Sequence, residues 1–155
     1  MPENLIFVPI DFDKESHSAK LEEVGFDRHK RSLFILEGVL MYLQPESANK
    51  TFRTMQEFAG MRSEVVFDYI YSSVLLSESL SDDEREIVRT VSKAGEQWHF
   101  GIGKGKIENF LADYGFELLE HLNSHQLEQT YFQDSNGVNI SRVNSTHCLV
   151  KVMKA

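Results

Sequence analysis

The residue with the clearest chemical potential is Glu37, which with Gly38 interrupts the otherwise apolar run from Leu33 to Leu43, LFILEGVLMYL. A lone ionised carboxylate inside an apolar run is destabilising unless another group pairs with it. We therefore expect Glu37 to lie at the mouth of a core element, facing a partner group.

Two further apolar runs end on an acid: LIFVPI ends at Asp11, and EVVF ends at Asp68. If the three runs are parallel strands, their carboxyl ends share one edge of a sheet, and this is the edge at which open α/β sheets bind ligands. Carboxylates accept hydrogen bonds, so an acidic edge suits a ligand that carries an amine, another positive centre or several hydrogen-bond donors.

The chain reads β-α-β-α-β-α-α-β-β, which predicts an α/β domain whose last strand is antiparallel. Apolar runs and alternating apolar and polar residues predict strands. Apolar residues at helical spacing predict helices, and Pro45, the Ser81/Glu84 capping box and Gly25 predict helix ends. The expected strands are 5–10, 33–36, 64–70, 116–122 and 146–153, and the expected helices are 14–24, 45–59, 81–98, 107–114 and 126–131.

Composition predicts one globular domain, residues 1–155, and excludes several partners. The net charge of -8 and the scattered basic residues argue against nucleic acid and anionic membranes. The single Cys148 cannot form an internal disulfide, and we find neither a signal-like segment nor a bilayer-spanning run, so we expect a cytoplasmic protein.

With these acids in place, the chain resembles the carboxyl-terminal part of the leucine carboxyl methyltransferase family of S-adenosylmethionine-dependent O-methyltransferases, which includes enzymes acting on tetracenomycin-type polyketides. The most specific matching segment is LEGVLMYLQPES at 36–47. The other matching segments are FVPIDF at 7–12, VGFD at 24–27, VVFDYI at 65–70, FGIGKGKIENFLADYGFELLEHL at 100–122 and the last strand.

The resemblance implies a cofactor, S-adenosylmethionine, and roles for individual residues. Asp11 with Phe12 would contact the adenine amino group, and Glu37 with Gly38 would receive the α-amino group of the methionine part. The implied reaction is methyl transfer to a carboxylate, hydroxyl or phenol of a small molecule. On the acceptor side we place three candidates, Tyr42, Asp68 and Tyr69, and the candidate general base is His99.

The chain also departs from the family, because it lacks the glycine-rich loop and the ribose-binding acid that family members carry ahead of FVPIDF. We expect a partial Rossmann-like class I methyltransferase sheet without its first two strands, with an edge open at Leu33 to Leu36. This predicts a homodimer or a complex with a separate amino-terminal half. The alternative function is accordingly a non-catalytic half-domain that completes a methyltransferase fold.

Each candidate residue also has an ordinary structural reading. Glu37 and Asp68 could cap backbone groups, Asp11 could belong to a turn, and Tyr42 could pack in the core. His147 and Cys148 are adjacent on a strand and therefore point to opposite faces, so we expect no metal site.

Overall fold

Four strands form one mixed sheet in the order β1 (Leu33–Leu36), β2 (Glu64–Ile70), β4 (His147–Lys154) and β3 (Phe116–Asn123). The structure is a computed structural model and describes residues 4–76 and 80–155. β1 runs parallel to β2, and β4 runs antiparallel to both of its neighbours. The expected α/β class and antiparallel last strand are therefore confirmed.

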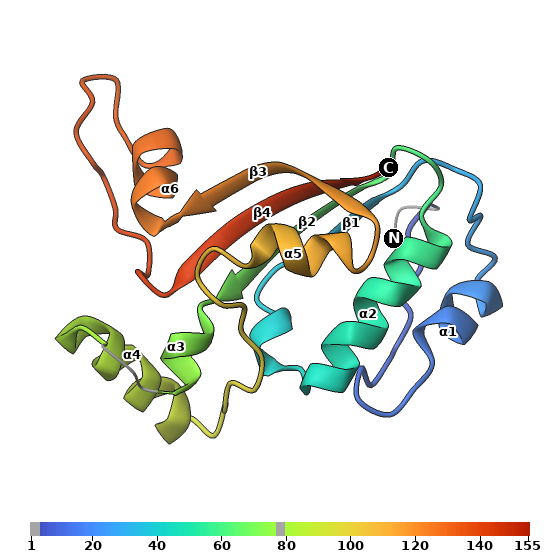
Figure 1. The fold of residues 1–155 in the computed structure, drawn as a ribbon, viewed down its shortest axis with the longest axis horizontal. Coiled ribbons are helices and arrows are strands. Elements are labelled where there is room, and N and C mark those ends of the chain that lie inside the picture. The colour runs from blue at the N-terminus through green and yellow to red at the C-terminus, as the bar shows by residue number, and fades with distance from the viewer. Residues whose placement is uncertain (1–3, 77–79) are drawn as a thin grey trace.

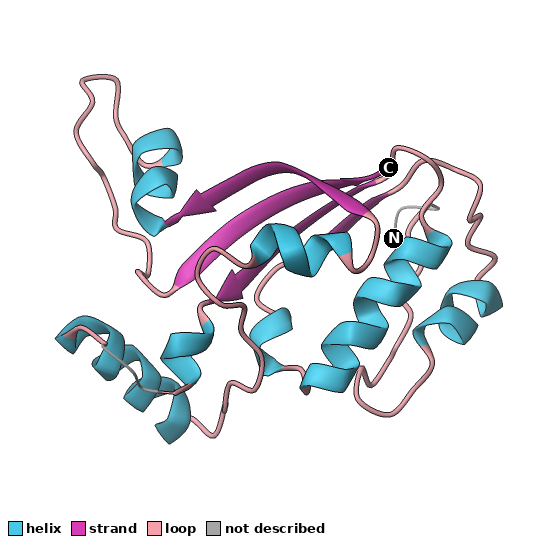
Figure 2. Ribbon diagram, viewed as in Figure 1, coloured by secondary structure: helices cyan, strands magenta, loops and turns pink. Residues whose placement is uncertain are grey.

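Helices α2 (Pro45–Phe58) and α5 (Ile107–Ala112) lie against one face of this sheet (Figures 1 and 2). Phe52 of α2 is fully buried and packs edge-on against Phe67 of β2 and Phe110 of α5. The remaining helices are α1 (His17–Glu23), the 3-10 helix η1 (Leu40–Tyr42), α3 (Ser72–Leu75), α4 (Asp82–Lys93) and α6 (Ser124–Tyr131).

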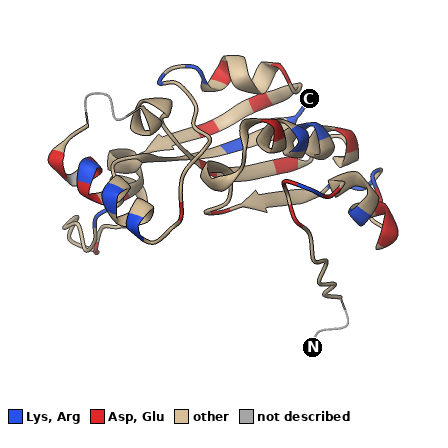
Figure 3. Ribbon diagram, turned by 90° about the horizontal axis from the view of Figure 1, so that it is seen from below, with Lys and Arg blue, Asp and Glu red and all other residues tan. Residues whose placement is uncertain are grey.

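The predicted strand at 5–10 is wrong. Residues 5–10 form no strand, and the side chain of Phe7 is 73% exposed. A strand needs a neighbour for its backbone groups, and this segment faces β1 across a cavity of about 190 Å³ lined by Val8 and Ile10 on one side and by Phe34 on the other. Figure 3 shows the segment leading away from the sheet towards the amino terminus.

Local sequence signals predict most helix ends correctly. Pro45 opens α2, the Ser81 and Glu84 side chains form the predicted capping box of α4, and Gly25 follows α1 with φ +72°. The expected helix 81–98 is too long, however, because α4 ends at Lys93. Gly95 then adopts φ +78°, which carries the chain out of the helix.

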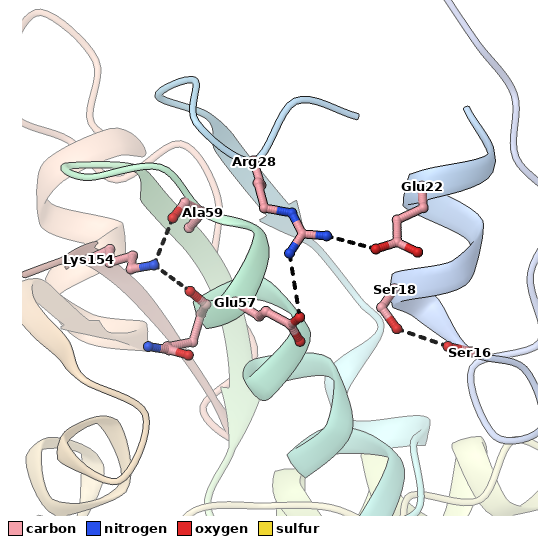
Figure 4. A network of polar contacts seen from close by, with 8 residues as sticks. Ser16, Ser18, Glu22, Arg28, Glu57, Ala59 and Lys154 are labelled. Carbon is pink, nitrogen blue, oxygen red and sulfur yellow. Dashed lines mark hydrogen bonds and ion pairs between the residues drawn. The ribbon is translucent and has the colours of Figure 1, made fainter. Parts of the chain in front are cut away.

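Polar contacts fasten the carboxyl end of α2 to the sheet and to α1 (Figure 4). The Lys154 ammonium of β4 donates to the carbonyl oxygens of Gln56, at 2.6 Å, and Ala59, at 2.8 Å. On the other side, Arg28 pairs with Glu22 of α1 at 2.7 Å and with Glu57 of α2 at 3.8 Å. A cation at this end also interacts favourably with the helix dipole.

We expect Lys154→Met to lower the free energy of unfolding by about 1–2 kcal/mol, because two carbonyl groups at the end of α2 lose a charged donor. Urea denaturation measures the change. The matched control is Lys50→Met, at an exposed position inside α2, which should leave stability within about 0.5 kcal/mol of wild type. Equal stability of the two variants would contradict this role for Lys154.

Candidate functional site

The candidate site begins where β1 ends. β1 finishes at Leu36, and Glu37 and Gly38 then turn the chain into η1. Glu37 is exposed, and among the described side chains no lysine or arginine forms an ion pair with it. Gly38 has φ +64°, a conformation that strains other residues. The turn therefore presents a carboxylate to solvent beside a backbone that a ligand can approach.

Asp68 fixes this turn. The Gly38 N–H donates to the Asp68 carboxylate at 2.7 Å. β2 spans Glu64–Ile70, as predicted, so Asp68 lies two residues before its end and pairs with Leu149 of β4. Because Leu36 pairs with Phe67, Glu37, directly after β1, lies beside Asp68 of β2. The structure thus brings two of the three predicted acids together.

Glu37 and Asp68 line a cavity of about 530 Å³ between the sheet and the segment that joins β3 to β4. Asn144 and His147 add polar groups, and the remaining walls are mainly apolar. The apolar lining residues include Ile35, Val66, Leu127, Phe132, Val143 and Leu149. A cavity with apolar walls and a few converging polar groups is typical of a small-molecule site.

His147 is the titratable base in this cavity. Its Nδ1 lies 2.9 Å from the Thr146 hydroxyl, and the Trp98 ring meets the imidazole edge-on at 5.7 Å. Burial lowers the pKa of His147 below its ordinary value, although the Asp68 carboxylate acts in the opposite direction. The imidazole is therefore kept neutral near pH 7 and able to accept a proton.

The lowered pKa of His147 gives a pH-dependent stability. The His147 imidazole binds a proton more tightly in the unfolded chain than in the folded one. The stability that the neutral imidazole contributes is therefore complete above about pH 6.5 and is lost as the pH falls through the lowered pKa. When the pH is lowered from about 7.5 to about 5.5, the free energy of unfolding should fall less in His147→Gln than in wild type. Urea denaturation at the two pH values measures the difference. His121, whose pKa burial also lowers, leaves part of the dependence in place.

The exposed His125 of α6 provides the control, and His125→Gln should retain the full pH dependence. An unchanged pH dependence in His147→Gln would contradict the buried neutral state of this imidazole.

Asp11 and Phe12 lie outside the cavity of Glu37. The Asp11 carboxylate binds Lys14 at 2.7 Å and accepts from the Asp13 N–H at 3.0 Å, as in an ordinary turn. The Lys14 ammonium beside it lowers the pKa of Asp11. The Phe12 ring packs edge-on against His17 at 4.7 Å.

The other candidate residues are dispersed. Tyr69 lies on the opposite face of β2 from Asp68, buried in the core with its hydroxyl 3.0 Å from His121 Nε2. The Tyr42 hydroxyl donates to Glu96 at 3.3 Å, and the backbone N–H of His99 donates to the Met41 carbonyl. None of the three lines the cavity.

Sequence reasoning missed Asn144 and His147 as members of this site. His147 enters it because β4 pairs with β2 antiparallel, so that Ile70 lies opposite His147. The register of two strands far apart in the chain carries no local signal, although the predicted antiparallel last strand does return the chain to this edge.

Comparisons with known proteins find similar sequences and similar folds. The leucine carboxyl methyltransferase family model matches residues 1–56. The chain is 25% identical over 154 residues to "Putative S-adenosyl-L-methionine-dependent methyltransferase YktD" of Bacillus subtilis (strain 168), covering 99% of this chain and 50% of that protein. It is 24% identical over 134 residues to a Mycobacterium ulcerans (strain Agy99) protein of the same description, covering 76% and 41%.

Among solved structures, a DUF574 family protein from Streptomyces avermitilis gives a TM-score of 0.62 at 12% identity, covering 94% of this chain and 53% of that one. The methyltransferase CalO6 gives 0.50 at 11% identity, covering 78% and 34%. The fold is therefore a partial Rossmann-like methyltransferase fold. The sequence matches show that the chain is similar to the leucine carboxyl methyltransferases over residues 1–56 and to S-adenosylmethionine-dependent methyltransferases along most of its length. The chain spans about half the length of the curated relatives it matches.

Within the described residues, no helix is both long and apolar enough to cross a membrane.

Proposed function

We propose that this chain binds S-adenosylmethionine through Glu37 and Gly38 and takes part in methyl transfer to an oxygen of a small molecule. The observation that carries the proposal is the exposed Glu37 carboxylate, which lines a cavity and has no cationic partner among the described side chains. An α-ammonium group is the complementary ligand, because charge-assisted hydrogen bonds to a carboxylate are the strong ones.

The residues present fit the methionine end of this cofactor. The position that a Cβ would take at Gly38 is open space. The Asp68 carboxylate fixes the turn by accepting a hydrogen bond from the Gly38 N–H. When bound, the sulfonium supplies an activated methyl group. The task that falls to the protein is to align the acceptor oxygen and to exclude water.

His147 is proposed as the base for a hydroxyl or phenol acceptor. The neutral imidazole would take the proton of the acceptor hydroxyl, and the bound cofactor would supply the methyl group. A carboxylate acceptor arrives without that proton and needs no base. His99, the candidate from the sequence, does not line the cavity, whereas His147 does.

The cavity walls favour an apolar acceptor. Leu127, Phe132 and Val143 come from the segment between β3 and β4, and they face the sheet residues across the cavity. Apolar walls with a few polar groups suit the flat body of an aromatic molecule that carries a hydroxyl or carboxyl group. A phenol of the polyketide type meets this description.

Isothermal titration calorimetry with S-adenosylhomocysteine tests the proposal, since this reaction product keeps the α-amino group that Glu37 would bind. We expect saturable binding with one ligand per chain. Absence of heat at about millimolar ligand, which corresponds to a binding free energy weaker than about -4 kcal/mol, would contradict cofactor binding by this chain.

The second candidate function is a non-catalytic half-domain. One observation favours it: Asp11, the expected adenine ligand, is engaged by Lys14 in a local turn. In that case the acidic turn at Glu37 contributes to a binding site only when the rest of the fold is supplied.

A further inference from the structure

His147 is the first residue of β4, and a series of hydrogen-bonded side chains leads to its ring from the preceding turn. The series runs from Asn144, which lines the cavity, through Thr146, which is fully buried, to the imidazole of His147. The Thr146 hydroxyl lies 2.8 Å from Asn144 Oδ1 and 2.9 Å from His147 Nδ1. A buried hydroxyl is destabilising unless it is hydrogen-bonded, so these contacts account for its place in the interior.

The backbone fixes the direction of these bonds at their Asn144 end. The Thr146 N–H donates to Asn144 Oδ1 at 3.0 Å. Because a backbone N–H can only donate, the atom that it reaches is the amide oxygen and not the amide nitrogen. The His147 N–H also donates, at 3.2 Å, to the Asn144 carbonyl oxygen, which closes the turn. The amide oxygen is therefore held as an acceptor beside the Thr146 hydroxyl.

The proton of the Thr146 hydroxyl can take two positions. If Thr146 donates to Asn144, its oxygen accepts from His147 Nδ1–H, and both contacts are hydrogen bonds. If Thr146 instead donates to Nδ1, its oxygen and the amide oxygen lie 2.8 Å apart with no hydrogen between them. The second arrangement loses a hydrogen bond and opposes two partial negative charges, so the first is favoured. Nδ1 then carries the hydrogen of the neutral imidazole, and Nε2 carries the lone pair.

The Nε2 atom of His147 is available to a ligand. His147 lines the cavity, and its ring is hydrogen-bonded within the described part of the chain only through Nδ1. Among the described residues, Trp98 Nε1 is the only buried side-chain nitrogen or oxygen that has no hydrogen-bond partner, so His147 Nε2 is not sealed from solvent. The Trp98 ring, edge-on at 5.7 Å, and the Thr146 hydroxyl together restrict rotation of the imidazole.

We propose that Thr146 is a positioning residue, which holds His147 in the Nδ1–H tautomer so that the Nε2 lone pair accepts the proton of a hydroxyl or phenol in the cavity. The identity of this proton donor rests on the proposed function, whereas the tautomer follows from hydrogen bonds within the chain. The proton passes from the hydroxyl to Nε2, Nδ1 keeps its own hydrogen, and the imidazolium later releases the transferred proton to solvent.

The hydrogen bonds around Thr146 need no rearrangement when His147 takes up this proton. Both nitrogens of an imidazolium donate, so the bond from Nδ1–H to the Thr146 oxygen persists. The Asp68 carboxylate favours the charged ring, since it raises the pKa of His147 against the effect of burial. Hydrogen bonds that are already in place stabilise a developing charge without the cost of reorganisation.

Nuclear magnetic resonance of the chain with ¹⁵N-labelled histidine rings tests this tautomer without any ligand. Long-range proton–nitrogen spectra distinguish a protonated ring nitrogen from an unprotonated one, and the His147 signals are identified by their loss in His147→Gln. At about pH 7.5, above the ordinary pKa of histidine, we expect Nδ1 to carry the hydrogen and Nε2 to carry none. A wild-type chain in which the Nε2–H form predominates would overturn the proposal.

Thr146→Val removes the hydroxyl and keeps the branched shape of the side chain. It should lower the ratio of the Nδ1–H form to the Nε2–H form by about fivefold or more, the effect of losing one hydrogen bond of ordinary strength. The matched variant Thr146→Ser keeps the hydroxyl and should keep the wild-type ratio. Thermal unfolding shows whether both variants fold. An unchanged ratio in folded Thr146→Val, or an equal fall in Thr146→Ser, would refute the role of Thr146.

Asn144→Ala is a second test, which does not depend on the folding of Thr146→Val. Without the amide oxygen, the Thr146 hydroxyl is free to donate to Nδ1, so the share of the Nε2–H form should rise. The wild-type ratio in this variant would contradict the direction assigned to these bonds. Because the tautomer is measured in the free chain, a failure of S-adenosylhomocysteine to bind would sink the proposed function and leave these ratios as they are.

Discussion

Replacing Glu37 by Gln should weaken the binding of S-adenosylhomocysteine by about tenfold or more, the consequence of losing a charge-assisted hydrogen bond to the α-ammonium group. The substitution keeps the size of the side chain, removes its charge and replaces one acceptor oxygen by an NH₂ donor. Because Glu37 is exposed and the Gly38 N–H bonds to Asp68, the turn should keep its shape. Calorimetry gives the two dissociation constants.

The matched control is Glu86→Gln, which removes the same charge from an exposed position on α4. It lowers the net negative charge equally, so any general electrostatic effect on the ligand appears in both variants. An affinity of Glu37→Gln equal to that of the control would exclude a direct contact between Glu37 and the ligand.

Phe52→Ala should destabilise the fold by about 3–5 kcal/mol, because it leaves a cavity in the centre of the core. The ring is fully buried and contacts aromatic rings of β2, α5 and Tyr114 at centroid distances of 5.0 to 5.3 Å. Such a loss is a large fraction of the stability of an ordinary domain. Urea denaturation at neutral pH measures it.

Phe7→Ala makes the same chemical change at a ring that is 73% exposed, and it should alter stability by less than about 0.5 kcal/mol. Similar losses in the two variants would contradict the position of Phe52 in the core.

The sequence could predict most of the sheet because its strands carry the signal locally. Glu64–Ile70 alternates buried and half-buried residues, and so does His147–Lys154, so their patterns reflect one covered face and one open face. The residues at 5–10 are equally apolar and branched, yet they form no strand, because strand formation also needs a neighbouring edge that composition does not encode.

The site was predictable only in part. Glu37 is recognisable as a site residue because an ionised carboxylate in an apolar run is destabilising unless another group pairs with it. Its place directly after β1 follows from the length of that strand. The bond from Gly38 to Asp68 depends on the parallel register of β1 and β2, and the approach of His147 depends on the antiparallel register of β4. Both registers join residues at least thirty positions apart, beyond the reach of local patterns.

The central claim is that the turn at Glu37 and Gly38 receives the methionine end of the cofactor. Its most direct test follows the backbone amide signals of the ¹⁵N-labelled chain by nuclear magnetic resonance during titration with S-adenosylhomocysteine. The account predicts that the Gly38 signal shifts in a saturable manner, while the signal of Gly115, which precedes β3 at the opposite end of the sheet, stays in place. Saturable shifts that leave Gly38 unmoved would contradict it.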